Sequence, residues 1–134
     1  MKRSKEESTR WLVQSKHDLK RGIKLLQEND YAYACFFAEQ SAQKSLKSFL
    51  LFKGKRFVIT HSVGELAKEA VVFEPSFNEL VDEAKRLDRH YLASRYPDAL
   101  PSPAIPAESY VESEAKEAIA IAQKIFDKSQ SIIK

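Results

Sequence analysis

The sequence is poor in the residues that build tight loops, cofactor cradles and covalent cross-links. Its 134 residues include three Gly, five Pro and one Cys. The phosphate-binding loops of dinucleotide-binding proteins and P-loop NTPases need closely spaced glycines, and the sequence has no such stretch. The single cysteine, Cys35, excludes an intrachain disulfide. Because it lies on the apolar face of a predicted helix, we expect a buried thiol rather than a reactive one.

Long apolar runs and a concentrated charge excess are also missing. No stretch approaches the roughly 18 apolar residues of a membrane span, and the N-terminal MKRSKEESTRW lacks the apolar run of a signal peptide. We therefore expect a cytoplasmic protein with no membrane partner. The formal net charge of +3 permits a polyanionic partner without requiring one. The three His and the carboxylates show no ligand-type spacing, so we expect no metal site, and we expect no cofactor.

The rest of the composition is that of an ordinary globular protein, and the length fits one domain over residues 1–134. The least polar long stretch is 30–53, which contains neither Gly nor Pro and predicts a central helix. One edge of this helix carries small side chains, a candidate dimer face or a tight intrachain contact. These are Ala34, Ser41, Ser45 and Ser48. A polar stripe is predicted to face solvent. It comprises Gln40, Gln43, Lys44 and Lys47.

Local signals place the ends of this helix and of the one before it. Apolar periodicity predicts a first helix over about 4–28. Asn29 tolerates the left-handed conformation that ends a helix, and Asp30 can cap the next one. So short a link requires an antiparallel pair. Gly54 stands where a residue just past a helix end is expected.

Three more helices are predicted in the second half of the chain. Ser62 and Glu65 have the spacing of a capping box and open a short helix. The segment 75–93 has a continuous apolar face and predicts a long one. Ser109 and Glu112 form a second capping-box pattern before a long terminal helix. The predicted fold is therefore all-α, an up-and-down bundle of four long helices and one short helix.

Two polar features interrupt this pattern. Asp88 falls on the apolar face of 75–93, where a carboxylate needs a partner, and Arg95 or tyrosine hydroxyls are the nearest candidates. The segment 95–107 holds four of the five prolines, so we predict an ordered, non-helical loop that wraps the domain. His61, just before a cap, is interpreted as a structural residue that packs at the helix entry.

The order of these features resembles the HEPN family of small helical domains. The resemblance rests on Trp11 and Asp18 in the first helix, on FFAEQSAQKSLK at 36–47, on His61 with Ser62, and on LDRHY and RYPD at 87–91 and 95–98. It spans nearly the whole chain. It implies a helical bundle that forms a homodimer, and in prokaryotes a frequent pairing with a separate minimal nucleotidyltransferase, often as a toxin–antitoxin pair.

Many members of the family are metal-independent ribonucleases with an Arg followed, after four to six residues, by a His. The resemblance implies that His would move a proton and Arg would neutralise charge developing on the phosphate. Here Arg86 and His90 are separated by three residues, and no His follows Arg95. Those members also tend to have Glu where this chain has Gln43.

Three hypotheses follow. The first is a binding subunit for a nucleotide, an RNA end or a nucleotidyltransferase partner. Its candidate contacts are Asp88, Tyr91, Arg95, Tyr96, Asp98, Lys44 and Lys47. The second is a ribonuclease that uses His90 with Arg86 or Arg95. The third is a purely structural dimerisation domain. In a competing interpretation, Asp88, Tyr91 and Arg95 form a buried structural network at the end of their helix.

Overall fold

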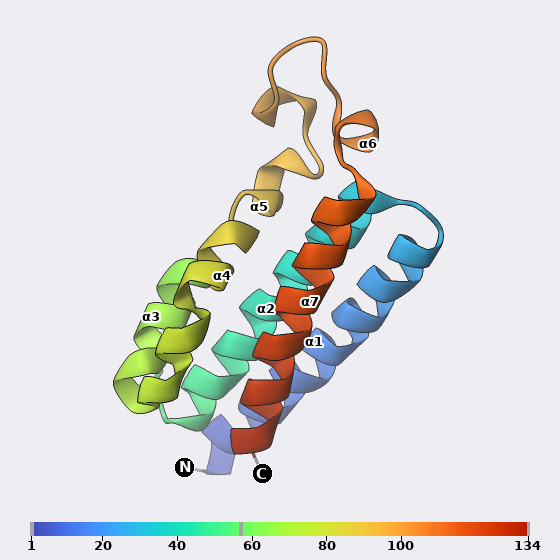
Figure 1. Ribbon diagram of the computed structural model, residues 1–134. Helices are drawn as coiled ribbons and strands as arrows, with labels where there is room; N and C mark the ends of the chain where they lie inside the picture. Colours follow the sequence, from blue (N-terminus) through green and yellow to red (C-terminus); the bar gives the residue numbers. More distant parts are fainter. Residues whose placement is uncertain (1, 57, 134) are drawn as a thin grey trace.

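The computed structural model describes residues 2–56 and 58–133, and none of these residues forms a strand. Three long helices make up most of the chain: α1 (Lys2–Gln27), α2 (Tyr31–Phe52) and α7 (Glu112–Ile132). They lie side by side, with α1 and α7 both packed on α2 (Figure 1). The predicted all-α helical bundle is confirmed.

The predicted helix ends around α2 are also confirmed. Asn29 has a φ of 62°, the left-handed conformation that ends α1, and Gly54 has a φ of 90° just after α2. Asp30 occupies the N-cap position of α2, but its side chain makes no capping hydrogen bond. The two helices reverse direction through a link with backbone hydrogen bonds to the end of α1 and one side-chain bond, in which the Tyr31 hydroxyl donates to Asn29 Oδ1 at 3.1 Å.

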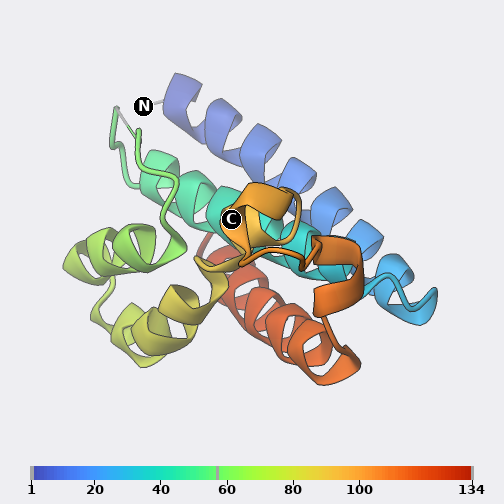
Figure 2. The same ribbon diagram turned by 90° about the horizontal axis from the view of Figure 1, so that it is seen from above.

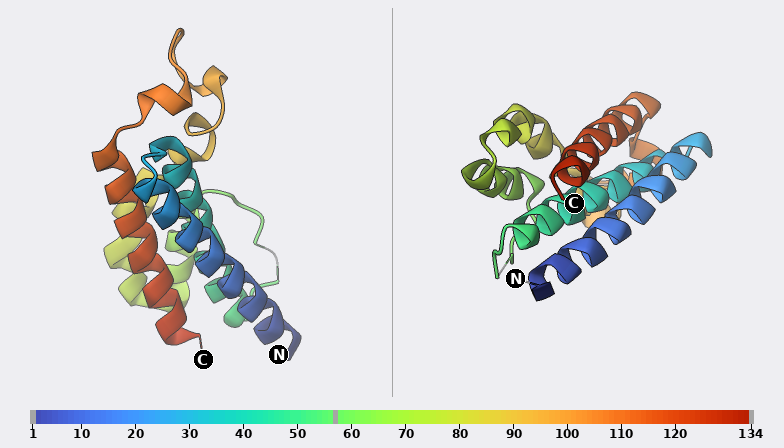
Figure 3. Two further views of the ribbon diagram at one scale, coloured as in Figure 1. Left: turned by 90° about the vertical axis from the view of Figure 1, so that its right-hand side faces the viewer. Right: turned by 90° about the horizontal axis from the view of Figure 1, so that it is seen from below.

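A second layer of shorter helices covers the opposite side of α2. It consists of α3 (Val63–Phe73), a 3₁₀ turn η1 (Pro75–Leu80) and α4 (Val81–Leu87). Viewed along the bundle, α3 and α4 lie apart from α1, and α2 and α7 lie between α1 and these two helices (Figure 2). Residues 58–62 run back along the bundle, without helix or strand, to the start of α3 (Figure 3).

The prediction of one continuous helix over 75–93 is wrong. Its first turn is 3₁₀, α4 ends at Leu87, and a separate turn of helix, α5 (His90–Ala93), follows. The break falls at Asp88, whose carboxylate bonds to the first turn of α3.

The proline-rich segment stands at one end of the bundle, opposite the two termini, and does not wrap the domain (Figure 1). It contains two short helical pieces, η2 (Pro97–Ala99) and α6 (Pro106–Ser109), so the prediction that it is wholly non-helical is wrong. Each piece has proline at a first-turn position, where the missing N–H costs nothing.

The predicted cap of α7 is also wrong. The Ser109 hydroxyl donates to the Ile105 carbonyl, and the Val111 N–H donates to Glu114 Oε1 at 3.2 Å.

The core is centred on α2. Phe49 packs against Phe77 of η1 with ring centroids 4.7 Å apart, and both are fully buried. Burial of each such side chain contributes about 1.5–3 kcal/mol to folding. Cys35 lies in the same core, and burial raises the pKa of its thiol to about 12, as expected for an unreactive cysteine. No helix within the described ranges is long and apolar enough to cross a membrane.

The small edge of α2 is an intrachain contact with α1. Ser41 Oγ donates to the Ser15 carbonyl at 2.8 Å, and in return Ser8 Oγ on α1 donates to the Ser48 carbonyl at 2.7 Å. Gly22 of α1 lies close to α2 and α7, since a Cβ there would lie 3.4 Å from the Ala34 carbonyl oxygen of α2 and 2.9 Å from Ile119 Cδ1 of α7. The edge therefore contributes to the fold of the single chain.

Candidate functional site

Polar side chains gather where α2 faces α3 and α5, at the end of the bundle that carries the proline-rich segment. We call this group the Arg95 cluster. It comprises Phe36, Glu39, Gln43, His61, Tyr91, Arg95 and Tyr96. The predicted wet stripe of α2 is wrong at two positions, because Gln43 is only 5% exposed and Lys47 only 7%. Segment 53–62 brings His61 onto Gln43 and Val58 beside Lys47.

Glu39 is the most unusual member of the cluster, since its carboxyl group is fully buried without an ion pair in the described structure. It accepts hydrogen bonds from the Gln40 and Gln43 side-chain amides at 2.8 and 2.7 Å. Burial raises its pKa to about 7; these amide hydrogen bonds and the Arg95 charge lower it, whereas the Asp88 charge raises it. The carboxyl group is therefore poised to gain or lose a proton near neutral pH.

Two aromatic side chains form one wall of the cluster. The exposed ring of His61 stacks on Tyr91, with centroids 5.7 Å apart and 11° between the planes. Its Nδ1 lies 3.3 Å from Gln43 Oε1, which orients the imidazole. Together with Ser62 and Asp88, these two rings line a hollow of about 240 Å³.

Arg95 is held by aromatic rings and a backbone carbonyl rather than by an acid. Its guanidinium carbon lies 4.4 Å from the centroid of Phe36, 5.4 Å from that of Tyr91 and 4.9 Å from that of Tyr96. Nε and Nη2 donate to the Tyr91 carbonyl at 3.2 and 2.8 Å. No carboxylate in residues 2–56 and 58–133 forms an ion pair with it. The remaining N–H groups are thus available to an anion.

The Asp88 carboxylate caps the start of α3. The prediction that it pairs with Arg95 or a tyrosine hydroxyl is therefore wrong. Its carboxylate accepts from Ser62 Oγ at 2.8 Å and from the Val63 and Gly64 N–H groups at 2.5 and 3.2 Å. These are the first N–H groups of α3, where a negative charge is favourable. Ser62 Oγ in turn accepts from Glu65 N at 3.1 Å, as its capping pattern predicts.

A scan against family models matches residues 8–132 to the HEPN domain. The chain belongs to the HEPN family. No curated protein matches the chain.

Three solved structures share this HEPN fold. TT1696 from Thermus thermophilus is 37% identical over 92% of this chain and 96% of its own, with a TM-score of 0.83. The archaeal HEPN homologue ST0689 is 31% identical over 95% and 98% of the two chains, with a TM-score of 0.77. The HEPN domain protein TM0613 from Thermotoga maritima is 28% identical over 92% and 96%, with a TM-score of 0.72.

His90 and Arg86 of the ribonuclease hypothesis lie apart from this cluster in the HEPN chain, whereas its alternative arginine, Arg95, is the centre of the cluster. His90 is 2% exposed, and its Nδ1 lies 3.0 Å from the Tyr110 hydroxyl. Burial, and then the charge of Arg89, lower its pKa to about 4, so the ring is neutral at neutral pH. Arg86 points to α7, where Nη1 lies 3.6 Å from Glu117 Oε2. The pair therefore does not form a solvent-accessible site within this chain.

The residues predicted to contact a nucleotide or RNA lie at several separate places in the HEPN chain. Tyr91, Arg95 and Tyr96 come together, and Asp88 lies beside them at the start of α3. Lys44 forms an ion pair with Asp18 of α1. Lys47 lies against Trp11, and the exposed Asp98 lines a different hollow, within the proline-rich segment. Lys44, Lys47 and Asp98 are therefore not members of the Arg95 cluster.

Three contributors to this HEPN site were missed from the sequence. Glu39 and Phe36 are not among the predicted site residues, although both lie in the FFAEQSAQKSLK segment. Gly64 is needed because a Cβ there would lie 2.7 Å from Lys85 Cγ and 3.1 Å from Asp88 Oδ2. One signal was present for Glu39, a carboxylate among small and apolar residues at 34–42, whereas the other two depend on contacts with distant segments.

Proposed function

We propose that this HEPN protein is a binding subunit that holds a nucleotide or an RNA end at the Arg95 cluster. The observation that carries the proposal is the Arg95 guanidinium, fixed among three aromatic rings with no acid partner in the described chain. Structural arginines are normally neutralised by a carboxylate. An arginine that is positioned but not neutralised offers its free N–H groups to a phosphate.

The surroundings of Arg95 fit the rest of a nucleotide. Tyr96 is 50% exposed and the exposed His61 ring stacks on Tyr91, so flat surfaces are available to a base. With a pKa of about 7, Glu39 is partly protonated at neutral pH, which reduces its repulsion of an arriving phosphate. The cluster thus combines a phosphate contact and stacking surfaces at one place.

The proposal extends to the assembly. We propose that the protein acts as a homodimer beside a separate minimal nucleotidyltransferase, as part of a toxin–antitoxin-like pair. This part rests on the family alone. Light scattering on the purified protein tests the dimer: a mass of one chain at all concentrations would contradict it. Incubation with such a transferase and a nucleoside triphosphate, followed by mass spectrometry, tests whether Tyr91 or Tyr96 accepts a nucleotidyl group.

Calorimetric titration with AMP, ATP and a short single-stranded RNA tests the binding site. Arg95→Met should weaken binding by about tenfold or more, because it removes a charge-assisted contact worth roughly 1.5–3 kcal/mol. Arg86→Met is the matched control, since Arg86 is exposed and lies toward α7. It removes the same charge and should leave the affinity unchanged. Equal affinities in the two variants would contradict the proposed site.

A second candidate function is RNA cleavage, with His61 as the proton-transfer group. The observation that favours it is the contrast between the two histidines: His61 is exposed beside Arg95's partner Tyr91, whereas His90 is buried against Tyr110. A metal-free cleavage assay on a mixed RNA pool should compare wild type, His61→Ala and His90→Ala. Cleavage lost only in His61→Ala would support catalysis by this cluster. A well-folded protein that cleaves nothing leaves the binding subunit in place.

A further inference from the structure

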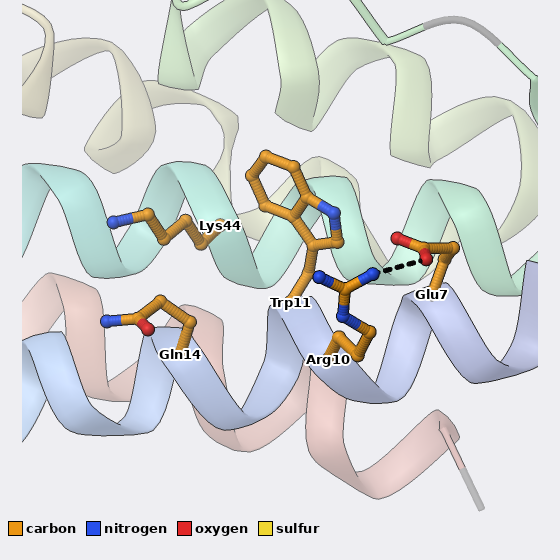
Figure 4. A pocket seen from close by; sticks show the side chains of 5 residues that line it. All are labelled: Glu7, Arg10, Trp11, Gln14 and Lys44. Carbon is orange, nitrogen blue, oxygen red and sulfur yellow. Dashed lines mark hydrogen bonds and ion pairs between the residues drawn. The ribbon is translucent and has the colours of Figure 1, made fainter.

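A second polar hollow lies on the α1 side of α2, toward the opposite end of the helix from Arg95. We call it the Trp11 hollow. It has a volume of about 300 Å³ and is lined by Glu7, Trp11, Lys47, Leu51, Arg56 and Val58. Trp11 separates it from a neighbouring hollow that includes Lys44. In Figure 4 the Trp11 indole stands between Lys44 on one side and Glu7 on the other.

The Trp11 hollow is rich in donors that have no acceptor. Within residues 2–56 and 58–133, neither Lys47 Nζ, Trp11 Nε1 nor the Arg56 guanidinium has a hydrogen-bond or ion-pair partner. The one acid in the lining, Glu7, is already bonded to Arg10 at 2.7 Å (Figure 4). Lysine, arginine and indole side chains can only donate hydrogen bonds. The hollow therefore lacks an acceptor for three donors.

Lys47 is the decisive residue because its side chain is only 7% exposed and has no ion-pair partner in the described part of the chain, while its ammonium nitrogen is open to the solvent of the hollow. Its Nζ lies 5.4 Å from the centroid of the Trp11 ring. Burial lowers the pKa of its ammonium group, the Glu39 charge opposes this shift, and the Lys44 charge adds to it. The stem of Lys47 is desolvated and ordered by its neighbours, so an anion in the hollow would meet a positive charge in a less polar environment than at a fully exposed lysine.

We propose that the Trp11 hollow binds a small organic phosphate, a phosphate monoester on a flat or apolar body. A phosphate monoester brings a charge of about −1.5 to −2 and several acceptor oxygens, which matches two cations and an indole N–H better than one carboxylate does. The remaining lining is the Trp11 ring with the Leu51 and Val58 side chains, so the carrier of the phosphate must be apolar or aromatic on one side.

This site is distinct from the proposed function, since it uses neither Arg95 nor Tyr91. Trp11 is the one tryptophan of the sequence, so intrinsic tryptophan fluorescence reports on this hollow directly. The probe is phenyl phosphate, which has the minimal phosphate and ring. We expect a saturable change in Trp11 fluorescence, a weaker effect of inorganic phosphate, and none with phenol.

Lys47→Met should weaken phenyl phosphate binding about tenfold or more, because it removes the Lys47 ammonium group from the hollow. Lys53→Met is the matched control: it removes an exposed positive charge just after α2 and should leave the affinity within about twofold. Thermal unfolding checks that both variants fold. Trp11→Phe, followed by calorimetry, keeps a ring but removes the N–H and should weaken binding severalfold.

Two outcomes would overturn the proposal: no saturable fluorescence change in folded wild-type protein up to millimolar phenyl phosphate, or an unchanged affinity in Lys47→Met. Arg95→Met separates this site from the proposed function. If the Trp11 hollow binds by itself, Arg95→Met leaves the fluorescence titration unchanged. Loss of phenyl phosphate binding in a folded Arg95→Met variant would place the ligand in the Arg95 cluster and overturn the assignment to the Trp11 hollow.

Discussion

The two flanks of α2 solve the problem of buried polar groups in opposite ways. Toward α1, the helix uses neutral serine hydroxyls. Ser41 and Ser8 each donate to a backbone carbonyl of the other helix at 2.8 and 2.7 Å. Toward α3 and α5, it uses ionisable groups, among them the fully buried Glu39 and the Arg95 guanidinium held by rings.

The difference separates a permanent contact from a responsive one. A hydroxyl bonded to a carbonyl keeps its charge state at any ordinary pH, so these two bonds should contribute the same stability throughout. The other flank contains a carboxyl group whose pKa is about 7, and α5, which packs on α2, carries His90, whose pKa is about 4. The contribution of this flank to stability therefore depends on proton concentration.

Glu39→Gln should produce the largest effect. The folded-state pKa of Glu39 is raised from the ordinary 4.5 to about 7, so the folded state loses stability as pH rises through this window. From pH 5 to pH 8, the free energy of unfolding of wild type should fall by about 2–3 kcal/mol relative to the variant. Urea unfolding at both pH values measures this, with the exposed Glu28→Gln as control. A parallel pH dependence of the two proteins would show that Glu39 ionises normally.

His90→Gln should reveal a slope of the opposite sign. Burial lowers the folded-state pKa of His90 from 6.5 to about 4, so its contribution is present above pH 6.5 and is lost as the pH falls toward 4. Between pH 7 and pH 5, wild type should lose about 2 kcal/mol relative to the variant. In wild type the two slopes nearly cancel over this range, and only the single variants expose them. If His90→Gln and wild type respond alike to acid, the pKa of His90 is the same in the folded and unfolded states.

The α1 flank was largely predictable from the sequence, whereas the other flank was not. Helix periodicity, the left-handed Asn29 and the small edge at Ser41 are local signals, and each has a direct structural outcome. They depend on residues within one or two turns of each other. The same local reasoning correctly assigned Ser62 as the cap of α3.

The Arg95 cluster depends on contacts between segments far apart in sequence. Asp88 bonds Val63 and Gly64, which lie 25 and 24 residues earlier, and this contact accompanies the break between α4 and α5. A helical wheel places Asp88 on the apolar face but cannot tell which element meets it. Lys47 was assigned to solvent for the same reason, because the wheel ignores the returning segment that brings Val58 beside it.

Asp88→Ala should have the next largest effect, and it tests the link between fold and cluster. The change removes the acceptor for two first-turn N–H groups of α3 and should cost about 1–2 kcal/mol. Asp88→Asn keeps one acceptor oxygen without the charge and should cost less. Chemical unfolding measures both. Hydrogen exchange at the Val63 and Gly64 amides supplies an independent readout, and unchanged protection in Asp88→Ala would show that these amides find other acceptors.

Ser41→Ala and Ser8→Ala should have the smallest effects and complete the comparison. Each removes one buried hydroxyl–carbonyl bond between α1 and α2, worth about 1 kcal/mol, and leaves a carbonyl that its own helix still satisfies. The two sites lie on different turns, so the losses should add. Ser131→Ala, an exposed hydroxyl on α7, is the control and should be neutral. Because neither these hydroxyls nor the carbonyls that they bond titrate, both losses should be equal at pH 5 and pH 8. A loss that varies with pH would mean that the charged flank reaches across α2, and the two flanks could not be treated as independent.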